Sequence, residues 1–172
     1  MLPAELPRHL LLVSIGAVLA TGASAFLMTR PASCPHARLP ALTASPEGYQ
    51  RMEVRSASAL GNNEYAVRVG DADKALTLYV GSSEGLAISL HLQGEKYVRP
   101  LSMELMDSTL RELGATLDRV QIDSIRDRAY IGSIHVRGHN PIDARPSDAV
   151  ALAMIHGAPI YVADEVVAAA AH

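Results

Sequence analysis

The sequence predicts an α+β domain, in which helices pack against an antiparallel or mixed sheet. Three observations support this fold class. Stretches that alternate between apolar and polar residues and end at turn residues are typical of strands, and they occur on both sides of residues 82–113. Three longer segments each end at a glycine, as helices commonly do. Two of the strand-like stretches flank Arg126-Asp127-Arg128, which is the pattern of an antiparallel hairpin.

The expected strands follow from this alternation and from the turn signals between them. Residues 49–56 alternate, and the turn Gly61-Asn62-Asn63 separates them from a second strand at 65–69. Asp71-Ala72-Asp73 then leads into a third strand. In chain order, the third and later strands are expected at 75–80, 117–125, 129–137, 141–143 and 160–162.

The expected helices are bounded by hydroxyl or acidic residues at the start and by glycine at the end. The first runs from Ser82 or Ser83 to about Leu92, before Gly94, and the second from a Ser102 cap to Leu113, before Gly114. A third is expected at 146–156, because Pro146 has a fixed φ and no N–H and therefore suits the first helical position. Asp164 is expected to cap a terminal helix.

A short internal repeat connects two of these helices. Residues 83–90 align with 147–154, and in each a strand and a turn precede a hydroxyl residue, an acid and a helix closed by glycine. The repeat indicates a duplicated strand–helix unit within one sheet, although a match this short also arises by chance. If the units are related, Glu84 and Asp148 lie at equivalent helix starts and can face each other.

The densest group of reactive side chains is Asp143-Ala144-Arg145-Pro146-Ser147-Asp148. Asp143 ends a strand, and Asp148 falls in the first helical turn, where free N–H groups and the helix dipole favour a negative charge. Transitions from strand to helix are where sheets of this kind gather ligand-binding groups. A purely structural interpretation is also open, in which the helix is capped and Arg145 pairs with a neighbouring acid.

The string DARPSDAVALA at 143–153, followed by GAPIYVADEV at 157–166, resembles the bifunctional nuclease domain family. The resemblance begins with YQRMEV at 49–54 and includes LYVG at 78–81, Glu84 and RPLS at 99–102, so it covers roughly residues 48–168. It implies hydrolysis of DNA and RNA. Relatives often carry a histidine and an acid after an Arg-Pro-Leu-Thr motif, whereas this chain has Met103 and Glu104. A contribution of that histidine to cleavage would be missing here.

Cleavage of a phosphodiester requires an activated water and stabilisation of charge on the phosphate. A divalent cation such as Mg²⁺ or Mn²⁺, held by two or three carboxylates, supplies both, and an arginine can clamp the phosphate. The candidate catalytic acids and metal ligands are Asp143, Asp148 and Glu84. The candidate phosphate clamp is Arg145, with Arg99 as a second. Local salt bridges and helix capping are the competing explanations for these residues.

The histidines suggest no separate catalytic centre, because His91, His135, His139 and His156 show neither HxH nor HExxH spacing. Structural or solvated roles are expected for them. The single cysteine, Cys34, excludes an intramolecular disulfide and a cysteine-rich zinc site.

The charge balance argues against a tight, non-specific DNA binder. The residues from Glu47 onward contain 12 Lys and Arg against 17 Asp and Glu, whereas such proteins carry a basic face. A bound cation could still supply local positive charge. One Phe, six Tyr and no Trp give little support for stacked aromatic platforms.

The N-terminal residues read as a separate segment. Residues 10–28 carry no charge and are nearly long enough to cross a membrane as a helix, and Ala23-Ser24-Ala25 has the form of a cleavage site. Residues 1–28 are therefore either a secretory signal peptide or a transmembrane anchor. Residues 29–46, with four prolines, form a linker, and 47–172 form the domain. A cleaved signal would place this bacterial domain in the periplasm or the medium, whereas an uncleaved segment would anchor the domain to the membrane.

We therefore expect an exported or membrane-tethered nuclease that acts on DNA or RNA, with Mg²⁺ or Mn²⁺ as the expected cofactor. The alternative is a non-catalytic, homodimeric interaction or regulatory domain in which residues 143–148 are structural. A third hypothesis is a small-ligand sensor that uses the helix start as an anion site.

Overall fold

The computed structural model describes residues 45–70, 74–127 and 129–170, all within one compact unit, Pro40–His172. The predictions for residues 1–28, for most of the linker including Cys34, and for the turn at 71–73 lie outside the described residues. Within the described ranges, the search for a helix long and apolar enough to cross a membrane finds none.

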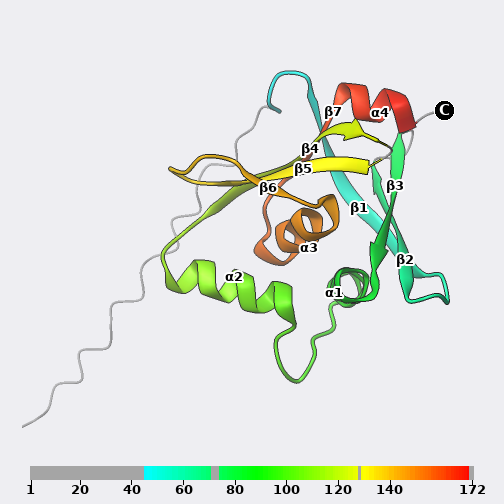
Figure 1. The fold of residues 1–172 in the computed structure, drawn as a ribbon. Helices are drawn as coiled ribbons and strands as arrows, with labels where there is room; N and C mark the ends of the chain where they lie inside the picture. The colour runs from blue at the N-terminus through cyan, green and yellow to red at the C-terminus, as the bar shows by residue number, and fades with distance from the viewer. Residues whose placement is uncertain (1–44, 71–73, 128, 171–172) are drawn as a thin grey trace, which may run out of the picture. The chain divides into compact units, whose positions relative to one another are not determined.

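Seven strands and four helices make up the domain, which confirms the predicted α+β class (Figure 1). The strands are β1 (Tyr49–Ala59), β2 (Glu64–Gly70), β3 (Ala75–Gly81), β4 (Leu117–Arg126), β5 (Ala129–Val136), β6 (Ile142–Ala144) and β7 (Ile160–Ala163). The helices are α1 (Ser82–Gln93), α2 (Ser102–Glu112), α3 (Pro146–His156) and α4 (Asp164–Ala170). Every predicted element is present, within a few residues at its ends.

Two predicted caps differ from the structure. Ser102 was expected to cap α2, but it is already helical, and the extended residue before it, Leu101, is the N-cap without a side-chain cap hydrogen bond. Asp164 is likewise the first residue of α4 rather than a residue before it. Its carboxylate accepts a hydrogen bond of 2.6 Å from the side-chain amide of Gln50, so it ties α4 to β1.

The sheet is mixed, with strand order β3-β2-β1-β7-β4-β5-β6. All neighbouring strands are antiparallel except β4 and β7, which are parallel. The last strand in the chain therefore lies in the middle of the sheet, where Val162 is opposite both Gln50 of β1 and Ile122 of β4.

Alternation along the central strands divides the sheet into two faces. Val120 and Ile122 of β4 are fully buried and belong to the core under the sheet, together with the buried run 149–153 of α3. Arg119, Gln121 and Asp123 alternate with them on the opposite face, which we call the outer face. Alternation thus separates an apolar face from a polar one on the same strand.

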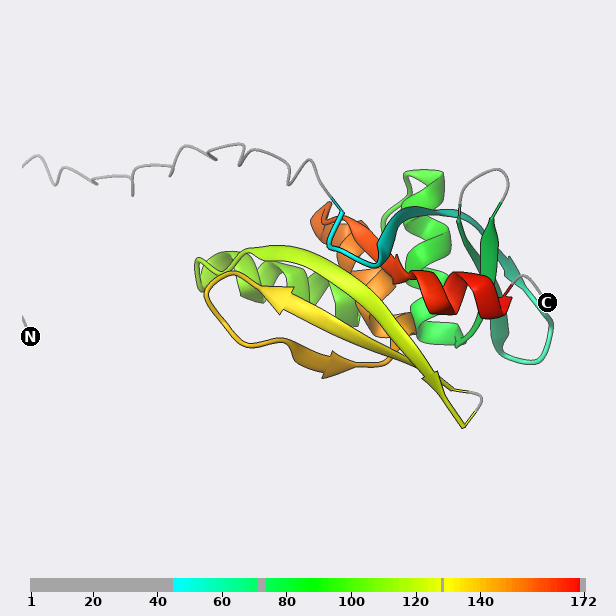
Figure 2. The ribbon, with the colours of Figure 1, turned by 90° about the horizontal axis from the view of Figure 1, so that it is seen from above.

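The helices are arranged around α3. Figure 1 shows α3 between α1 and α2 below the sheet, and Figure 2 shows β4, β5 and β6 crossing over α2 and α3. Ala149, Ala151 and Ala153 are completely buried, and such small side chains allow α3 to approach its neighbours closely. Gly132 of β5 also lies in a narrow space, because a Cβ there would be 3.0 Å from the backbone oxygen of Gln121 and 3.2 Å from that of Ala144, and it would contact the Cα of Pro146 at 3.5 Å. This packing fixes the start of α3 against the sheet. The fourth helix, α4, contacts β3, β4 and β7 instead.

Candidate functional site

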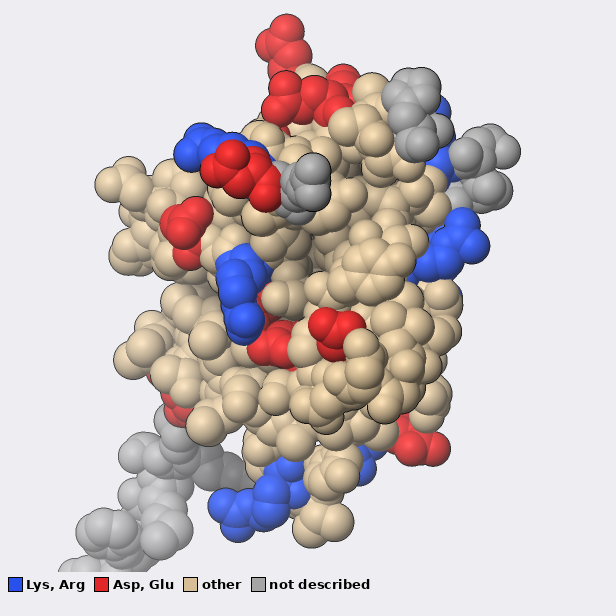
Figure 3. All heavy atoms as spheres, turned by 45° about the vertical axis from the view of Figure 1, so that its right-hand side comes forward, with Lys and Arg blue, Asp and Glu red and all other residues tan. Residues whose placement is uncertain are grey.

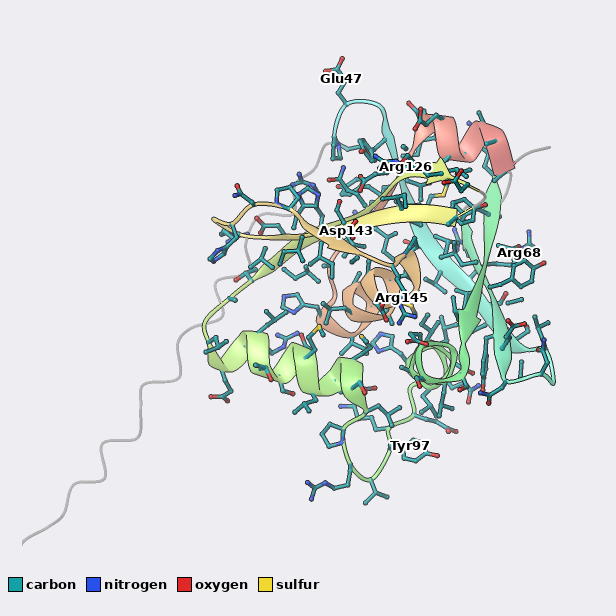
Figure 4. The ribbon with its side chains drawn as sticks, viewed as in Figure 1. Glu47, Arg68, Tyr97, Arg126, Asp143 and Arg145 are labelled. Atoms are coloured by element: carbon teal, nitrogen blue, oxygen red, sulfur yellow. The ribbon has the colours of Figure 1, made fainter. Side chains whose placement is uncertain are left out.

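The starts of α1 and α3 meet at Arg145, the N-cap residue of α3 (Figure 4). Its Nε donates to Oδ2 of Asp148 at 2.6 Å, and its Nη2 donates to Oδ1 of Asp148 at 2.9 Å. The same Nη2 also donates to Oε1 of Glu84 at 2.9 Å. One guanidinium therefore joins an acid of each helix, and we call these three residues the Arg145 cluster.

The two acids hold equivalent places, as the sequence repeat predicts. Glu84 is the third residue of α1 and Asp148 the third residue of α3, and each helix ends at a glycine in the left-handed conformation. Neither helix start has a side-chain cap hydrogen bond. The pairing of Arg145 with neighbouring acids is confirmed. At these two helix starts, Glu84 and Asp148 bind the Arg145 guanidinium, and no side chain caps the helix.

The cluster is buried on its acidic side and open on its basic side. The side chain of Glu84 is 13% exposed and that of Asp148 is 25% exposed, whereas Arg145 is 70% exposed. The hydrogen bonds and charge of Asp148, followed by the charge of Glu84, raise the pKa of Arg145. The guanidinium therefore stays charged, and it reaches solvent while its acids hold its orientation.

The donor set of this cluster does not fit a metal cage. Both oxygens of Asp148 and one oxygen of Glu84 already accept hydrogen bonds from the Arg145 guanidinium. In the described part of the chain, no three or more His, Cys, Asp or Glu side chains converge as metal ligands would. Metal binding by Asp143, Asp148 and Glu84 thus stays a prediction from the sequence.

The third predicted acid, Asp143, is not brought into the cluster. It lies in β6 opposite Ser133, and Ser133 lies opposite Gln121, so alternation places Asp143 on the outer face of the sheet. Asp143 is exposed and makes no hydrogen bond or ion pair with any described residue. The local salt bridge between Asp143 and Arg145 that the sequence also allowed is not formed (Figure 4).

Two grooves flank the cluster. The first, the Arg145 groove, has a volume of about 390 Å³ and lies between β3, the start of β5 and the start of α3, with Tyr79, Tyr130, Arg145 and Ser147 among its lining residues. The second, the Glu84 groove, has a volume of about 550 Å³ and is lined by Glu84, Ser82, Ser83, Ser102 and Met103, among others. Met103, for which the family resemblance predicts a histidine, lines the same groove as Glu84, and its thioether cannot transfer a proton.

The second predicted phosphate clamp, Arg99, is separate from the Arg145 cluster. It is exposed on the loop between α1 and α2, and it lines a third groove of about 520 Å³. We call this the loop groove. The loop groove and the Glu84 groove share Pro100 and Leu101, so they are neighbours on the surface.

A buried polar cluster that sequence reasoning missed joins α2 to the end of α3. Asp107 accepts from Nδ1 of His156 at 2.6 Å and from Nε of Arg111 at 2.8 Å, and the backbone N–H of Leu117 donates to Nε2 of His156 at 3.2 Å. Because Nε2 accepts, the arrangement assigns a neutral His156 that carries its proton on Nδ1. The structural role expected for His156 is confirmed. No spacing pattern could reveal a pair 49 residues apart.

The outer face holds a second set of polar contacts. The hydroxyl of Tyr49 in β1 donates to Asp123 in β4 at 2.9 Å, and burial together with Asp123 raises the pKa of Tyr49 to about 12. His135 shares a hydrogen bond of 3.1 Å with Ser133, and burial followed by the charge of Arg119 lowers its pKa. The Tyr49–Asp123 hydrogen bond connects β1 to β4 across β7, and the Ser133–His135 hydrogen bond lies within β5. Both contacts indicate a structural role.

The face of the described domain that is drawn in Figure 3 carries no broad basic patch. On the face in Figure 3, Lys and Arg side chains lie scattered among other residues, with acidic side chains between them. Any nucleic acid that binds this face must therefore depend on a few well-placed cations rather than on a continuous basic surface.

Comparison with known proteins connects this architecture to one family. A model of the family described as the bifunctional nuclease domain matches residues 67–172. An uncharacterized protein of Mycobacterium tuberculosis strain CDC 1551 / Oshkosh is 35% identical over 104 residues, which are 60% of this chain and 63% of that protein. An uncharacterized protein of strain ATCC 25618 / H37Rv matches with the same identity and coverage. The match spans less than two thirds of the length of these relatives.

Proposed function

On the premise that this chain belongs to the bifunctional nuclease domain family, we propose that it hydrolyses phosphodiester bonds in DNA or RNA at the Arg145 cluster. The observation that carries the proposal is an exposed guanidinium, fixed by acids from two helix starts, beside a groove that contains two tyrosines. A phosphate-binding cation and a stacking surface are both needed to hold a single strand.

Arg145 is the proposed phosphate ligand. Its Nε and Nη2 are engaged by Asp148 and Glu84, whereas its Nη1 donates to no described acceptor. A guanidinium carries five N–H donors, so the two hydrogens on Nη1 are available to a phosphate oxygen. The first turn of α3 adds unpaired backbone N–H groups beside it, which favour an anion.

The two acids are proposed to have different roles. Both carboxylate oxygens of Asp148 accept from Arg145, so Asp148 positions the guanidinium. Glu84 uses only Oε1 for Arg145 and lines a groove with its side chain. Its Oε2 accepts no hydrogen bond from the described residues. Glu84 is therefore the proposed general base for an attacking water.

The two tyrosines of the Arg145 groove favour a single-stranded substrate, because unpaired bases can stack on their rings. Tyr79 is 73% exposed on β3, and Tyr130 lies across the groove on β5. The small number of aromatic residues in the sequence did not predict that two tyrosines would line the same groove. Bases stack on such rings with little sequence preference, whereas paired bases in a duplex are not accessible to them.

Three finer points are also part of this proposal. Export or membrane tethering is supported by the uncharged residues 10–28. Assistance by Mg²⁺ or Mn²⁺ would require Arg145 to release at least one acid, and Asp143 would contribute only after a rearrangement. The experiment below distinguishes DNA from RNA as the substrate.

The test uses the purified full-length protein with labelled single-stranded DNA and RNA, in Mg²⁺, Mn²⁺ or EDTA. We expect Arg145→Gln to reduce the cleavage rate by roughly 10²-fold or more, as loss of a charge-stabilising donor does. Glu84→Gln should have an effect of similar size. Arg68→Ala, which removes an exposed arginine of β2, is the control and should cut like the wild type. Absence of cleavage by the wild type, or equal cleavage by Arg145→Gln, would contradict the proposal.

The alternative function, a dimeric interaction domain, is favoured by one observation. Three large apolar side chains are exposed along and just after α2, namely Leu105 at 60%, Met106 at 45% and Leu113 at 77%. Such side chains side by side are typical of interaction surfaces. Light scattering on the wild type and on Leu105→Ser tests this: a dimer that dissociates in the variant supports it, and a monomeric wild type contradicts it.

A further inference from the structure

The loop groove has the properties of a ligand site that the Arg145 cluster does not use. It has a volume of about 520 Å³, within the usual range for small-ligand sites. It lies between the end of α1, the start of α2 and the loop that joins them. Lys96, Tyr97, Arg99 and Glu104 are among the residues that line the groove.

The tip of this loop presents an aromatic ring between two cations. Tyr97 is 59% exposed and Val98 is 98% exposed, and Lys96 and Arg99 on either side are exposed as well (Figure 4). None of these side chains forms a hydrogen bond or ion pair with a described residue. An exposed ring beside free cations is the arrangement that proteins use for a stacked base and its phosphate.

Glu104 supplies the polar feature that distinguishes this groove. Its Oε2 is the one buried side-chain oxygen or nitrogen in the described chain that lacks a hydrogen-bond partner. A buried acceptor without a donor is costly, and in native structures it usually has a functional reason. Glu104 also lines the loop groove, so a ligand that brings an N–H group to this carboxylate would satisfy it.

We propose that the loop groove binds one nucleotide of a single strand, at a distance from the bond that is cut, and prefers a base with an exocyclic amino group. The base stacks on Tyr97, the amino group donates to Glu104, and Lys96 or Arg99 contacts the phosphate. Carboxylates accept from N4 of cytosine, whereas thymine and uracil present a carbonyl oxygen at that position. The inference rests on the proposed function only for its choice of nucleic acid as the ligand.

The position of the groove is consistent with one continuous strand. The loop groove adjoins the Glu84 groove through Pro100 and Leu101, and Glu84 is bonded to Arg145. A single strand that crosses the Arg145 cluster can therefore extend toward Tyr97. The loop groove would then select which bases lie next to the cleaved bond.

The experiment measures binding in EDTA by the full-length protein, using the fluorescence anisotropy of short labelled oligo(dC) and oligo(dT). We expect oligo(dC) to bind about tenfold more tightly, as one hydrogen bond to a charged group provides. Tyr97→Ala should weaken the binding of both by about fivefold or more, and Tyr97→Phe should retain it. Glu104→Gln should remove the preference for oligo(dC). Arg68→Ala should change neither affinity.

Three results would overturn the inference. The first is that the wild type binds neither oligonucleotide, and the second is that Tyr97→Ala binds as tightly as the wild type. The third is that Glu104→Gln keeps both the preference for oligo(dC) and the melting temperature of the wild type. Failure of the proposed function looks different. In that case the wild type cleaves nothing, yet its preference for oligo(dC) and the effect of Tyr97→Ala persist.

Discussion

Replacing Gly85 with alanine tests whether α1 is as close to the sheet as the site requires. Gly85 directly follows Glu84 in α1 and is buried. A Cβ at this position would lie 2.3 Å from Cγ, 2.4 Å from Cδ2 and 2.6 Å from Cβ of Tyr65. Because Tyr65 belongs to β2, the substitution directly tests the contact between helix and sheet.

Two opposing effects determine the result. In a helix interior alanine is better than glycine by about 1 kcal/mol, which would stabilise the variant. Overpacking costs typically about 1–3 kcal/mol or more, and here the ring cannot simply rotate away, because its own Cβ is one of the atoms in contact. We expect the clash to exceed the helical gain by about 1–2 kcal/mol. That difference lowers Tm by roughly 4–10 °C for a domain of this size.

Thermal unfolding followed by circular dichroism measures this difference. Ser83→Ala, at an exposed position of the same helix, is the control and should shift Tm by no more than about 2 °C. In a Tyr65→Ala background, Gly85→Ala should cost less, because the two ring contacts are gone. A Gly85→Ala variant that melts at or above the wild-type temperature would refute the close packing of α1 on β2.

Three further predictions concern side chains outside the cluster. His156→Ala should destabilise the domain by about 1–3 kcal/mol in chemical denaturation, because Oδ1 of Asp107 and the Leu117 N–H lose their partner. By comparison, His91→Ala, at an exposed position in the last turn of α1, should be nearly neutral. The pKa of Tyr49 rises from 10.0 to about 12, so the contribution of its buried, hydrogen-bonded hydroxyl to stability is complete below pH 10 and is lost as the pH rises toward 12. In an absorbance titration, Tyr49→Phe should therefore lack the last phase of tyrosine ionisation that the wild type shows. His135 has a lowered pKa, so the contribution of its neutral ring to stability is complete above pH 6.5 and decreases as the pH falls below that value. As the solution is acidified, an NMR titration should show the His135 ring protonating later than the exposed histidines. Simultaneous protonation would contradict the burial argument.

The local part of the fold could be predicted because its signals are local. Alternation in residues 49–56 identified β1, and Gly94 and Gly157 marked helix ends that the structure places in the left-handed conformation. The repeat even placed Glu84 and Asp148 at equivalent positions. The order of the strands could not be read in this way, because pairing of β7 with both β1 and β4 depends on contacts far apart in the sequence.

The candidate site was predictable only where spacing determines position. Asp148 and Arg145 are three residues apart at one helix start, so their pairing follows from helix geometry. Asp143 is only two residues from Arg145, but it belongs to a strand, and the strand turns it to the outer face. The partners of Asp107 and the unpaired oxygen of Glu104 arise from packing between helices, which leaves no pattern in the sequence.

The central position of β7 has a consequence for how the domain forms. Strands β1–β3 and strands β4–β6 are each made of neighbours in the chain, so each hairpin set can form early during synthesis. Within the sheet they are joined through β7, whose residues Ile160–Ala163 are synthesised after all the other strands. A nascent chain that ends before Ile160 therefore exposes two unpaired strand edges and an unfinished core, and it depends on chaperones or on rapid completion to avoid aggregation.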